Sequence, residues 1–372
     1  MTKPRFAFTI LALAIIVSAC AGGATPSPTS TSVPIPAATP VLTSTPVSIE
    51  DNYFTPYQDN PVLAPGSPGS WDAEAIFSSY VTFHDGLYHL YYNGVSEPDF
   101  ETLAIGYATS ADGRSFTRHA ANPILTGDQS GFDARRVGYG VPLVEGDTWI
   151  LYYNAGSGVG PGKTIGRATA SDPAGPWRRG TDYVLAVGGP GEWDSKFIIP
   201  ESVIATDEGY VMYYSGEYTY EDSGRQYGAT MIGMATSPDG IVWTKYDDPS
   251  TTDPPFAKSD PVLRPGPEGS WDAVGVWECA VRKTTSGWEM FYTGSDLQSV
   301  QIGYATSADG VHWTKHDDNP IFVPQVDPLA TEAEPFVLEA PSIIVNDSTY
   351  TLYYDYGLAT SGIGVAVGEI PR

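Results

Sequence analysis

The sequence is poor in cysteine, and its two cysteines, Cys20 and Cys279, are too few to build the disulfide framework of many small secreted domains. It is also poor in basic residues, because 19 lysines and arginines stand against 44 aspartates and glutamates, for a formal net charge of −25. A surface this acidic repels nucleic acid and anionic lipid and argues against a polyanionic substrate. Beyond the first residues there is no long apolar run and no convincing 3.6-residue apolar period, which argues against membrane spans and helices.

The N-terminus has the order of an export signal. Lys3 and Arg5 precede an apolar run over residues 6–17 that is too short to span a bilayer comfortably. The run ends in VSAC, which resembles the lipobox of bacterial lipoproteins, and this resemblance implies that Cys20 becomes the lipidated first residue of a mature protein on the outer face of the cell membrane. An ordinary signal peptide cleaved nearby is the alternative. Residues 1–20 are therefore expected to be the signal and lipidation site.

Two further segments follow this signal. Residues 21–47 are rich in Pro, Ser and Thr and carry no charge, so they are expected to form a disordered tether. Residues 48–372 are expected to form the folded domain.

What the sequence has in abundance is repetition, since one block recurs about every 60 residues. It starts with an aromatic–Asp pair before a short apolar strand (WDAEAIFSSYV), continues with a hairpin and an aromatic strand (LYHLYYNG), and adds a strand that opens with Ile-Gly (IGYATS). A turn such as ADG and a fourth short strand close the unit. Strand-length, alternating segments bounded by turn residues, repeated five times, predict an all-β, five-bladed β-propeller of four-stranded antiparallel blades.

The ends of the chain predict how this ring closes. The fifth copy lacks the Trp-Asp pair and stops before a fourth strand, whereas an unattached DNPVLAPG stands at residues 59–66. Because a ring of blades exposes strand edges unless it is closed, residues 60–64 are predicted to supply the outer strand of the last blade. The third copy carries an insertion of roughly 17 residues, which is expected to form loops on one face, often the binding face.

Repetition also separates acids that serve every blade from acids that serve one site. An aspartate recurs after the aromatic residue at Asp72, Asp133, Asp194 and Asp272, where hydrogen bonding at the strand entry is the main expectation.

Three glutamates, in contrast, each occur in one copy only. Glu201, Glu278 and Glu339 stand near the start of the first strands of the third, fourth and fifth blades. First strands line the axis of a propeller, so the three side chains are expected to converge at one mouth of the channel. Glu201 and Glu339 share a strand face, whereas Glu278 falls between them and would point away unless a β-bulge re-aims it. Glycoside hydrolysis needs such a group, with one protonated acid and one ionised partner whose pKa values are held apart.

Over about 310 residues the pattern WD…SV…YYSG…IGYATSxDGxxW resembles the five-bladed glycoside hydrolase clan, families 32, 43, 62, 68, 117 and 130, which includes arabinanases, levansucrases and invertases. VWECAV, with Glu278, is similar to the motif that holds the acid of family 32, and LEAPSI, with Glu339, is similar to the motif that holds the acid of family 43. Both families place a catalytic Asp on the first blade, where this chain reads FSSYV, and blade 2 lacks an Arg-Asp-Pro motif. Asp72 or Glu74 from the entry loop, or Glu201, are the substitutes.

The sequence thus predicts a glycosidase that acts on a neutral oligo- or polysaccharide, with no nucleic-acid partner, no cofactor and a monomeric state. Catalysis is expected from Glu339 or Glu278 as general acid and Glu201 as base or partner carboxylate. Residues expected to bind the sugar are Arg135, Arg136, Trp277, Tyr139, Asp72 and Glu74. Three alternatives stay open. The chain could be a non-catalytic carbohydrate-binding propeller or a phosphorylase of the family 130 type, for which Arg135–Arg136 is the basic pair near the mouth, or the glutamates could form local salt bridges with Arg135, Arg136 or Lys196. No histidine or cysteine spacing predicts a metal site, although a structural cation in the channel stays open.

Overall fold

The structure, a computed structural model, describes residues 52–97, 102–156, 162–222, 225–323, 337–357 and 362–370. The predicted export signal at residues 1–20 and the predicted tether at residues 21–47 lie outside these ranges. Within the described ranges, no helix has the length and apolar character needed to cross a membrane.

The described chain is all-β, and its one helical element is a 3-10 turn at Gly131–Asp133. Five three-stranded antiparallel meanders follow one another along it. They consist of β2 (Ala75–His84), β3 (Leu87–Val95) and β4 (Ala104–Ser110); β6 (Arg136–Glu145), β7 (Thr148–Gly156) and β8 (Thr164–Ala170); β11 (Phe197–Thr206), β12 (Gly209–Asp222) and β13 (Arg225–Ser237); β16 (Gly275–Thr284), β17 (Gly287–Ser295) and β18 (Val300–Ser307); and β20 (Leu338–Asn346), β21 (Thr349–Tyr356) and β22 (Gly362–Gly368).

Short strands pair with the outer strand of each meander. These are β1 (Phe54–Pro56) on β22, β5 (Thr117–Arg118) on β4, β9 (Arg178–Arg179) and β10 (Leu185–Ala186) on β8, β14 (Thr244–Lys245) and β15 (Pro261–Leu263) on β13, and β19 (Trp313–Lys315) on β18. The predicted all-β, antiparallel class is therefore confirmed.

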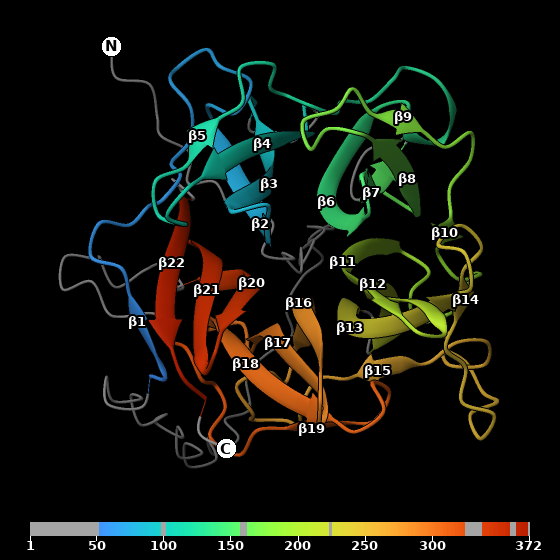
Figure 1. The fold of residues 1–372 in the computed structure, drawn as a ribbon. Coiled ribbons are helices and arrows are strands. Elements are labelled where there is room, and N and C mark those ends of the chain that lie inside the picture. Colours follow the sequence, from blue (N-terminus) through green and yellow to red (C-terminus); the bar gives the residue numbers. More distant parts are fainter. Residues whose placement is uncertain are drawn as a thin grey trace, which may run out of the picture.

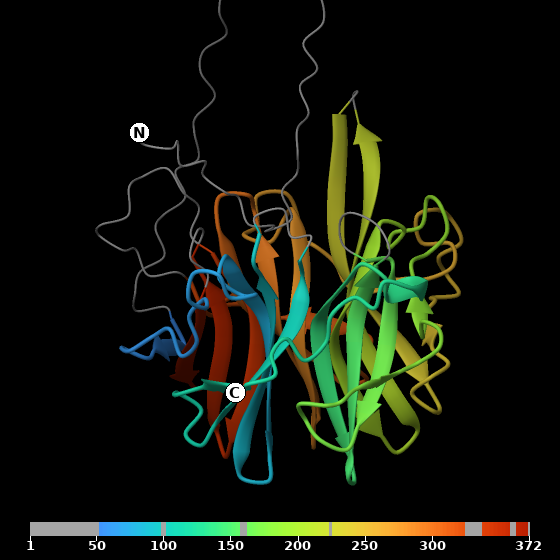
Figure 2. The same ribbon diagram turned by 90° about the horizontal axis from the view of Figure 1, so that it is seen from above.

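The meanders are arranged around a common centre, as Figure 1 shows along the axis and Figure 2 shows from the side. The first strand of each meander lies innermost, and the later strands lie farther out. This is a propeller-like arrangement. Figure 2 also shows that the hairpin of β12 and β13, which contains part of the insertion in the third repeat, projects beyond the other strands on one face.

Adjacent aromatic residues on the middle strand fill the core on both sides of each meander. The fully buried pairs are Tyr91–Tyr92, Tyr152–Tyr153, Tyr213–Tyr214, Phe291–Tyr292 and Tyr353–Tyr354. Because successive strand residues point to opposite faces, the first member of a pair reaches the next meander. Its hydroxyl donates to a backbone carbonyl in a turn there: Tyr91 to Pro173 (2.7 Å), Tyr152 to Gly240 (2.8 Å), Tyr213 to Gly310 (2.8 Å), and Tyr353 of the last meander to Gly113 of the first (2.9 Å).

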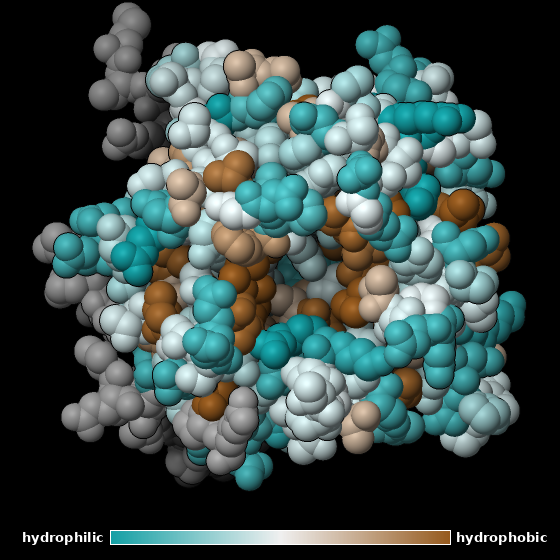
Figure 3. All heavy atoms as spheres, viewed as in Figure 1, coloured by the Kyte–Doolittle hydropathy of each residue, from teal (hydrophilic) through white to brown (hydrophobic). Residues whose placement is uncertain are grey.

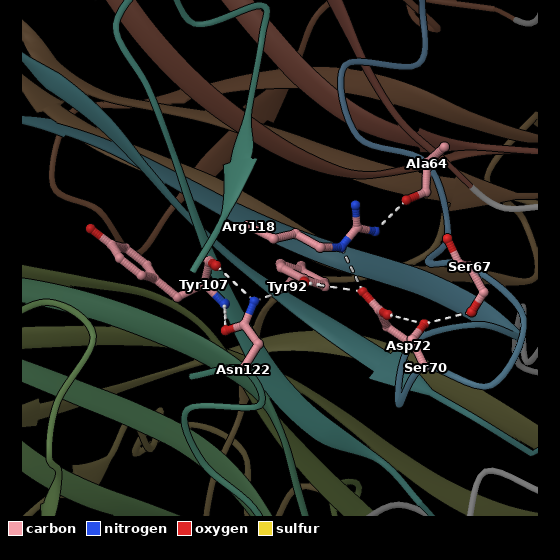
Figure 4. Close-up of polar contacts among 8 residues, drawn as sticks. All are labelled: Ala64, Ser67, Ser70, Asp72, Tyr92, Tyr107, Arg118 and Asn122. Atoms are coloured by element: carbon pink, nitrogen blue, oxygen red, sulfur yellow. Dashed lines mark hydrogen bonds and ion pairs between the residues drawn. The ribbon is translucent and has the colours of Figure 1, made fainter. Parts of the chain in front are cut away.

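The aspartate that recurs after the aromatic residue anchors its own meander. Asp72 accepts hydrogen bonds from the hydroxyls of Ser70 (2.8 Å) and Tyr92 (3.1 Å) and from the guanidinium of Arg118 (2.7 Å), as Figure 4 shows. Arg118 also donates to the carbonyl of Ala64. The arrangement recurs with Asp133, Tyr153 and Arg179; with Asp194, Tyr214 and Lys245; and with Asp272, Tyr292 and Lys315. These contacts tie the entry loop, the middle strand and the outermost strand together.

The N-terminal segment packs on the outer edge of the last meander. β1 pairs antiparallel with β22, and Leu63 forms an isolated antiparallel bridge with Ile363. The Asn60 amide brackets the backbone of Val365 and contacts the Tyr354 hydroxyl. Asn122 makes the same contacts to Tyr107 and Tyr92, and Asn319 makes them to Tyr304 and Tyr292.

The regular strand in this segment lies earlier than the predicted residues 60–64. Residues 54–63, FTPYQDNPVL, match the whole unit FTRHAANPIL at residues 116–125, so the pairing starts at the FT step. Residues 60–64 contribute one isolated bridge, between Leu63 and Ile363, and the N–H of Val62 also donates to the carbonyl of Ile363.

Lys245 provides a test of the repeated anchor, because its partner Asp194 is fully buried. Replacing Lys245 with methionine leaves a buried carboxylate without its cation, so the free energy of unfolding is expected to fall by about 3–5 kcal/mol. Chemical denaturation measures this loss. The double variant Lys245→Met/Asp194→Asn is expected to regain part of it, and a double variant no more stable than Lys245→Met would contradict the ion-pair explanation.

Candidate active site

Each innermost strand carries a β-bulge at the same depth. The pairing with the middle strand shifts between Phe77 and Tyr80 in β2, Gly138 and Val141 in β6, Pro200 and Ser202 in β11, Trp277 and Cys279 in β16, and Glu339 and Ser342 in β20. Four bulges contain a non-glycine residue in the left-handed region: Ser78 (φ 45°), Tyr139 (φ 55°), Glu278 (φ 40°) and Ala340 (φ 54°). A bulge re-aims side chains, so the feature that Glu278 needs in order to join Glu201 and Glu339 is present.

A side chain from the neighbouring meander holds each left-handed residue by its N–H. Asn93 Oδ1 accepts from Tyr139 at 2.6 Å, Ser215 Oγ from Glu278 at 3.0 Å, and Thr293 Oγ1 from Ala340 at 3.1 Å, while an Asp355 carboxylate oxygen accepts from Ser78. All four acceptors directly follow the aromatic pair of a middle strand. Pro200 has no N–H at the matching position, and there Asn154 donates to the carbonyl of Ile198 at 2.6 Å.

The three predicted glutamates are buried within this ring of bulges, with exposed fractions of 8% for Glu201 and 9% for Glu278 and Glu339. Glu201 Oε1 accepts from the Ser215 hydroxyl at 2.6 Å, and the same hydroxyl oxygen accepts the N–H of Glu278. One serine therefore connects two of the glutamates. Glu278 Oε1 accepts from the Ser78 hydroxyl at 2.7 Å, and its Oε2 has no hydrogen-bond partner. Glu339 accepts a hydrogen bond from the side chain of Trp277.

Burial is the main cause of raised pKa values in this group, and mutual repulsion adds to it. The pKa of Glu278 is raised to about 7 by burial, against the opposing effect of the Ser78 hydroxyl. The pKa values of Glu201 and Glu339 lie well above the usual range because of burial and then the charge of Glu278. The three glutamates thus interact electrostatically, and Glu278 is common to both pairs. Carboxyls with separated pKa values can include one protonated and one ionised member at the same pH.

A small cavity of about 30 Å³ lies among these residues, lined by side chains that include Ser79, Tyr139, Glu201 and Glu278. It has space for one or two water molecules but none for a sugar ring, so a saccharide would have to bind outward from it. Within the part of the chain that the structure describes, no group of His, Cys, Asp and Glu side chains is arranged to hold a metal ion.

Tyr80 of β2 forms a side-chain hydrogen bond with Ser202 of β11, so two non-adjacent meanders meet inside the channel. A second cavity of about 40 Å³ is lined by Tyr80, Val81, Phe291 and Ile343 among others. Figure 3, drawn from the same side as Figure 1, shows that the centre of this face is hollowed and bordered by apolar residues. Aromatic and aliphatic side chains therefore line this part of the channel.

The structure separates the residues predicted to bind sugar into two groups. Tyr139 and Trp277 lie beside the glutamates, and Arg136 is buried close enough to Tyr139 to influence its pKa. Arg135 and Glu74 are exposed, at the start of β6 and in the loop before β2.

Asp72 and Lys196 lie elsewhere. Asp72 belongs to the structural anchor with Arg118 and does not line the cavity. Lys196 pairs with Glu217 of β12 and not with Glu201, so this part of the local salt-bridge alternative is not what the structure shows.

One buried acid beside the glutamates was not predicted from the sequence. Asp355 of β21 is 2% exposed, accepts hydrogen bonds from the backbone N–H groups of Ser78 and Ser79, and interacts electrostatically with Glu278 and Glu339. Burial, followed by the charge of Glu278, raises its pKa well above the usual range. A signal was available, since it is the one charged residue among Asn93, Asn154, Ser215, Thr293 and Asp355 after the aromatic pairs.

Comparison with known proteins places this site on a familiar fold. No protein-family model matches the chain. A 1,2-β-oligomannan phosphorylase from Thermoanaerobacter sp. (strain X514) is 26% identical over 332 residues, which cover 84% of this chain and 96% of that protein.

Solved structures of sugar-active enzymes share the fold. One, from a study of β-1,2-mannosidic glycoside hydrolases within the GH130 family of mannoside phosphorylases, has a TM-score of 0.64 at 20% identity, covering 86% of this chain and 96% of the other. The β-1,2-mannobiose phosphorylase from Listeria innocua, in complex with β-1,2-mannobiose, has a TM-score of 0.60 at 18% identity, covering 85% and 97%. Both similarities support the propeller-like architecture.

The buried carboxyls predict how stability depends on pH. A carboxyl whose pKa is raised by folding binds a proton in the native state that the unfolded chain has released, so its contribution is complete below the unfolded pKa and is lost as pH rises to the folded value. For Glu278 this window runs from 4.5 to about 7. We expect the free energy of unfolding to decrease across this window by about 1.4 kcal/mol for each unit of pKa shift.

Urea denaturation at a series of pH values measures this slope. Glu278→Gln is expected to flatten it, whereas Glu208→Gln, in the exposed turn between β11 and β12, should leave it unchanged. A free energy of unfolding that increases from pH 5 to pH 7 would show that the buried carboxyls are not protonated in the native state.

Proposed function

We propose that the protein is a glycoside hydrolase that acts on a neutral saccharide, with β-1,2-linked mannosides as the first class to test. The observation that carries the proposal is the burial of Glu201, Glu278 and Glu339, from three meanders, in one electrostatically interacting group, with Glu201 and Glu278 lining one small cavity. Burying several carboxyls together costs stability, so a functional role explains them better than packing does. The names of the similar proteins supply the mannoside class.

The pKa values favour different catalytic roles for the three glutamates. The pKa of Glu278 is raised to about 7, so this carboxyl ionises near neutral pH, which suits a carboxylate that activates water or attacks the sugar. Burial and the charge of Glu278 raise the pKa of Glu339 well above its usual range, against the opposing effect of the Trp277 hydrogen bond, which suits the general acid that protonates the leaving oxygen. Glu201 is joined to Glu278 through Ser215, whose hydroxyl donates to the Glu201 carboxylate and accepts the N–H of Glu278, and is the third carboxyl of the group.

Phosphorolysis is the second candidate, and the similarity to two phosphorylases favours it. A phosphate nucleophile needs cations or backbone N–H groups around it. Buried Arg136, beside Tyr139, is the cation that the described site offers, and it stands against four buried carboxyls. This imbalance is the reason to prefer water as the nucleophile.

We also propose that the five meanders are the blades of one closed ring and that the N-terminal segment completes the last blade. Three contacts support this closure. β1 pairs with β22, Asn60 bonds to Val365 and Tyr354, and the Tyr353 hydroxyl donates to the carbonyl of Gly113. The export signal and Cys20 support a further proposal, that the enzyme is tethered by lipid to the outer face of the cell membrane.

Activity assays test the function directly. The purified domain is incubated with aryl mannosides, arabinosides, fructosides and xylosides and with β-1,2-mannooligosaccharides, with and without phosphate. We expect phosphate-independent release of reducing sugar, and a decrease in kcat of about 10²–10⁴-fold in Glu339→Gln and in Glu278→Gln, because each removes an acid–base group. Glu208→Gln is the matched control and should keep full activity.

Other outcomes identify the alternatives. Turnover that requires phosphate and releases a sugar phosphate would establish the phosphorylase. Thermal stabilisation by a sugar without turnover would establish a carbohydrate-binding protein. Unchanged turnover in both glutamine variants would show that the assigned carboxyls are not the catalytic residues.

The tether has its own test. Expressed from residue 1 in a bacterial host, the protein is expected in the membrane fraction and labelled by a fatty acid precursor, because a lipidated cysteine partitions into the bilayer. Cys20→Ala should abolish the labelling and release the protein from membranes. Labelling that persists in Cys20→Ala would overturn the lipobox interpretation.

A further inference from the structure

A chain of contacts connects Asp355 to Glu278 across three meanders. Asp355 Oδ2, on β21, accepts the N–H of Ser78 in the bulge of β2, and the Ser78 hydroxyl donates to Glu278 Oε1, on β16, at 2.7 Å. Ser78 is a non-glycine residue at φ 45°, a backbone conformation that needs support from its surroundings. The direction of the Ser78 hydroxyl therefore depends on the Asp355 contact.

A charged residue is not needed to hold a bulge. At the equivalent positions Asn93, Ser215 and Thr293 hold the next bulge with a neutral acceptor. Asp355 makes the same contact with a carboxyl that is 2% exposed and whose Oδ1 has no hydrogen-bond partner. Burying this group is costly, so the charge requires an explanation beyond the fold.

The surroundings of Asp355 supply that explanation. Ionisable groups that face it are Glu278 of β16 and Glu339 of β20, while β2 contributes the N–H groups of Ser78 and Ser79 and β22 (GIGVAVG) contains no ionisable residue. Farther out, Tyr139 and Arg136 of β6 and Glu201 of β11 complete the group. Asp355 is thus an additional buried carboxyl that interacts electrostatically with both the proposed acid and the proposed carboxylate.

We propose that Asp355 is a positioning residue for the proposed hydrolase, which through Ser78 fixes the direction in which Glu278 presents its carboxylate to the substrate. This inference rests on the proposed function. Its charge has a second effect, because repulsion from Asp355 disfavours ionisation of Glu339 and so keeps the acid protonated at higher pH. Asp355 itself need not touch the sugar.

Two substitutions separate these effects. Asp355→Asn keeps an oxygen that can accept from Ser78, as Asn93 does from Tyr139, but removes the charge. We expect it to fold, to lose roughly tenfold in kcat, and to shift the basic limb of the pH–rate profile down by about one unit. Asp355→Ala also removes the contact to Ser78, so we expect a further loss of about 10²-fold in kcat from misplacement of Glu278.

Ser78→Ala tests the second contact in the chain. It keeps the N–H that Asp355 accepts and deletes the hydroxyl that lowers the pKa of Glu278. We expect the acid limb of the profile to move to higher pH, opposite in direction to Asp355→Asn. Asn319→Ala is the matched control, since Asn319 also bonds to strand backbone, at Tyr304 of β18, without contacting a carboxyl or a bulge. It should lower the melting temperature and leave both limbs in place.

The outcomes are distinct. A pH profile of Asp355→Asn that matches the wild type overturns the charge effect, and equal kcat in Asp355→Ala and Asp355→Asn overturns the positioning role. If the wild type turns over no glycoside, the proposed function has failed. The pH dependence of unfolding then tests the contact itself. The slope is expected to be shallower in Asp355→Asn than in Asn319→Ala, and identical slopes would overturn the link between Asp355 and the glutamates.

Discussion

The hydrogen bonds between a middle-strand side chain of one meander and the bulge of the next are the constraint on which this site depends. Without them, residues such as Glu278 and Tyr139 would not be kept in the left-handed region, where an L-residue is disfavoured. The bulge breaks the two-residue alternation of the strand. Side chains that alternation would send to different faces can therefore gather at one depth of the channel, which is how Glu278 joins Glu201 and Glu339.

The repeated residues are present where they support the architecture. Where one member of a repeated contact is missing, the other member is missing too. The last meander has no aspartate at the anchor position, and Pro56 stands where Arg118 and Lys315 provide the cation elsewhere. Similarly, Phe291 has no hydroxyl, whereas Tyr213 and Tyr353 donate to glycine carbonyls in ADG-type turns. A residue that loses its partner becomes a buried, unpaired polar group, so both members of a contact are absent together.

Much of this could be predicted from the sequence because repetition multiplies weak signals. Five copies of an alternating pattern fixed the strands and their order, and the unattached N-terminal unit located its partner at the far end of the chain. The start of that strand is hard to locate from the sequence, because FTP lacks the basic residue that marks FTR and WTK. The bulges were not predictable, since they depend on side chains from a neighbouring meander. Asp355 is hard to recognise from the sequence because it stands within an aromatic strand, and Asp72 resembles a site residue because its ion-pair partner Arg118 lies 46 residues away.

The same geometry explains why the acidic group cannot be assigned to any single meander. Each carboxyl is oriented by atoms from a different part of the chain: Glu201 by Ser215 and the backbone of β16, Glu278 by Ser78, and Ser78 by Asp355. Four carboxyls in one enclosed region oppose folding at neutral pH, and the ion-paired aspartates and aromatic core of the surrounding meanders must offset that cost. Stability is therefore supplied at the periphery, by repeated residues, while the centre is free to hold residues that occur once. Changes at the centre should then affect proton binding more than architecture, and changes at the periphery should do the reverse.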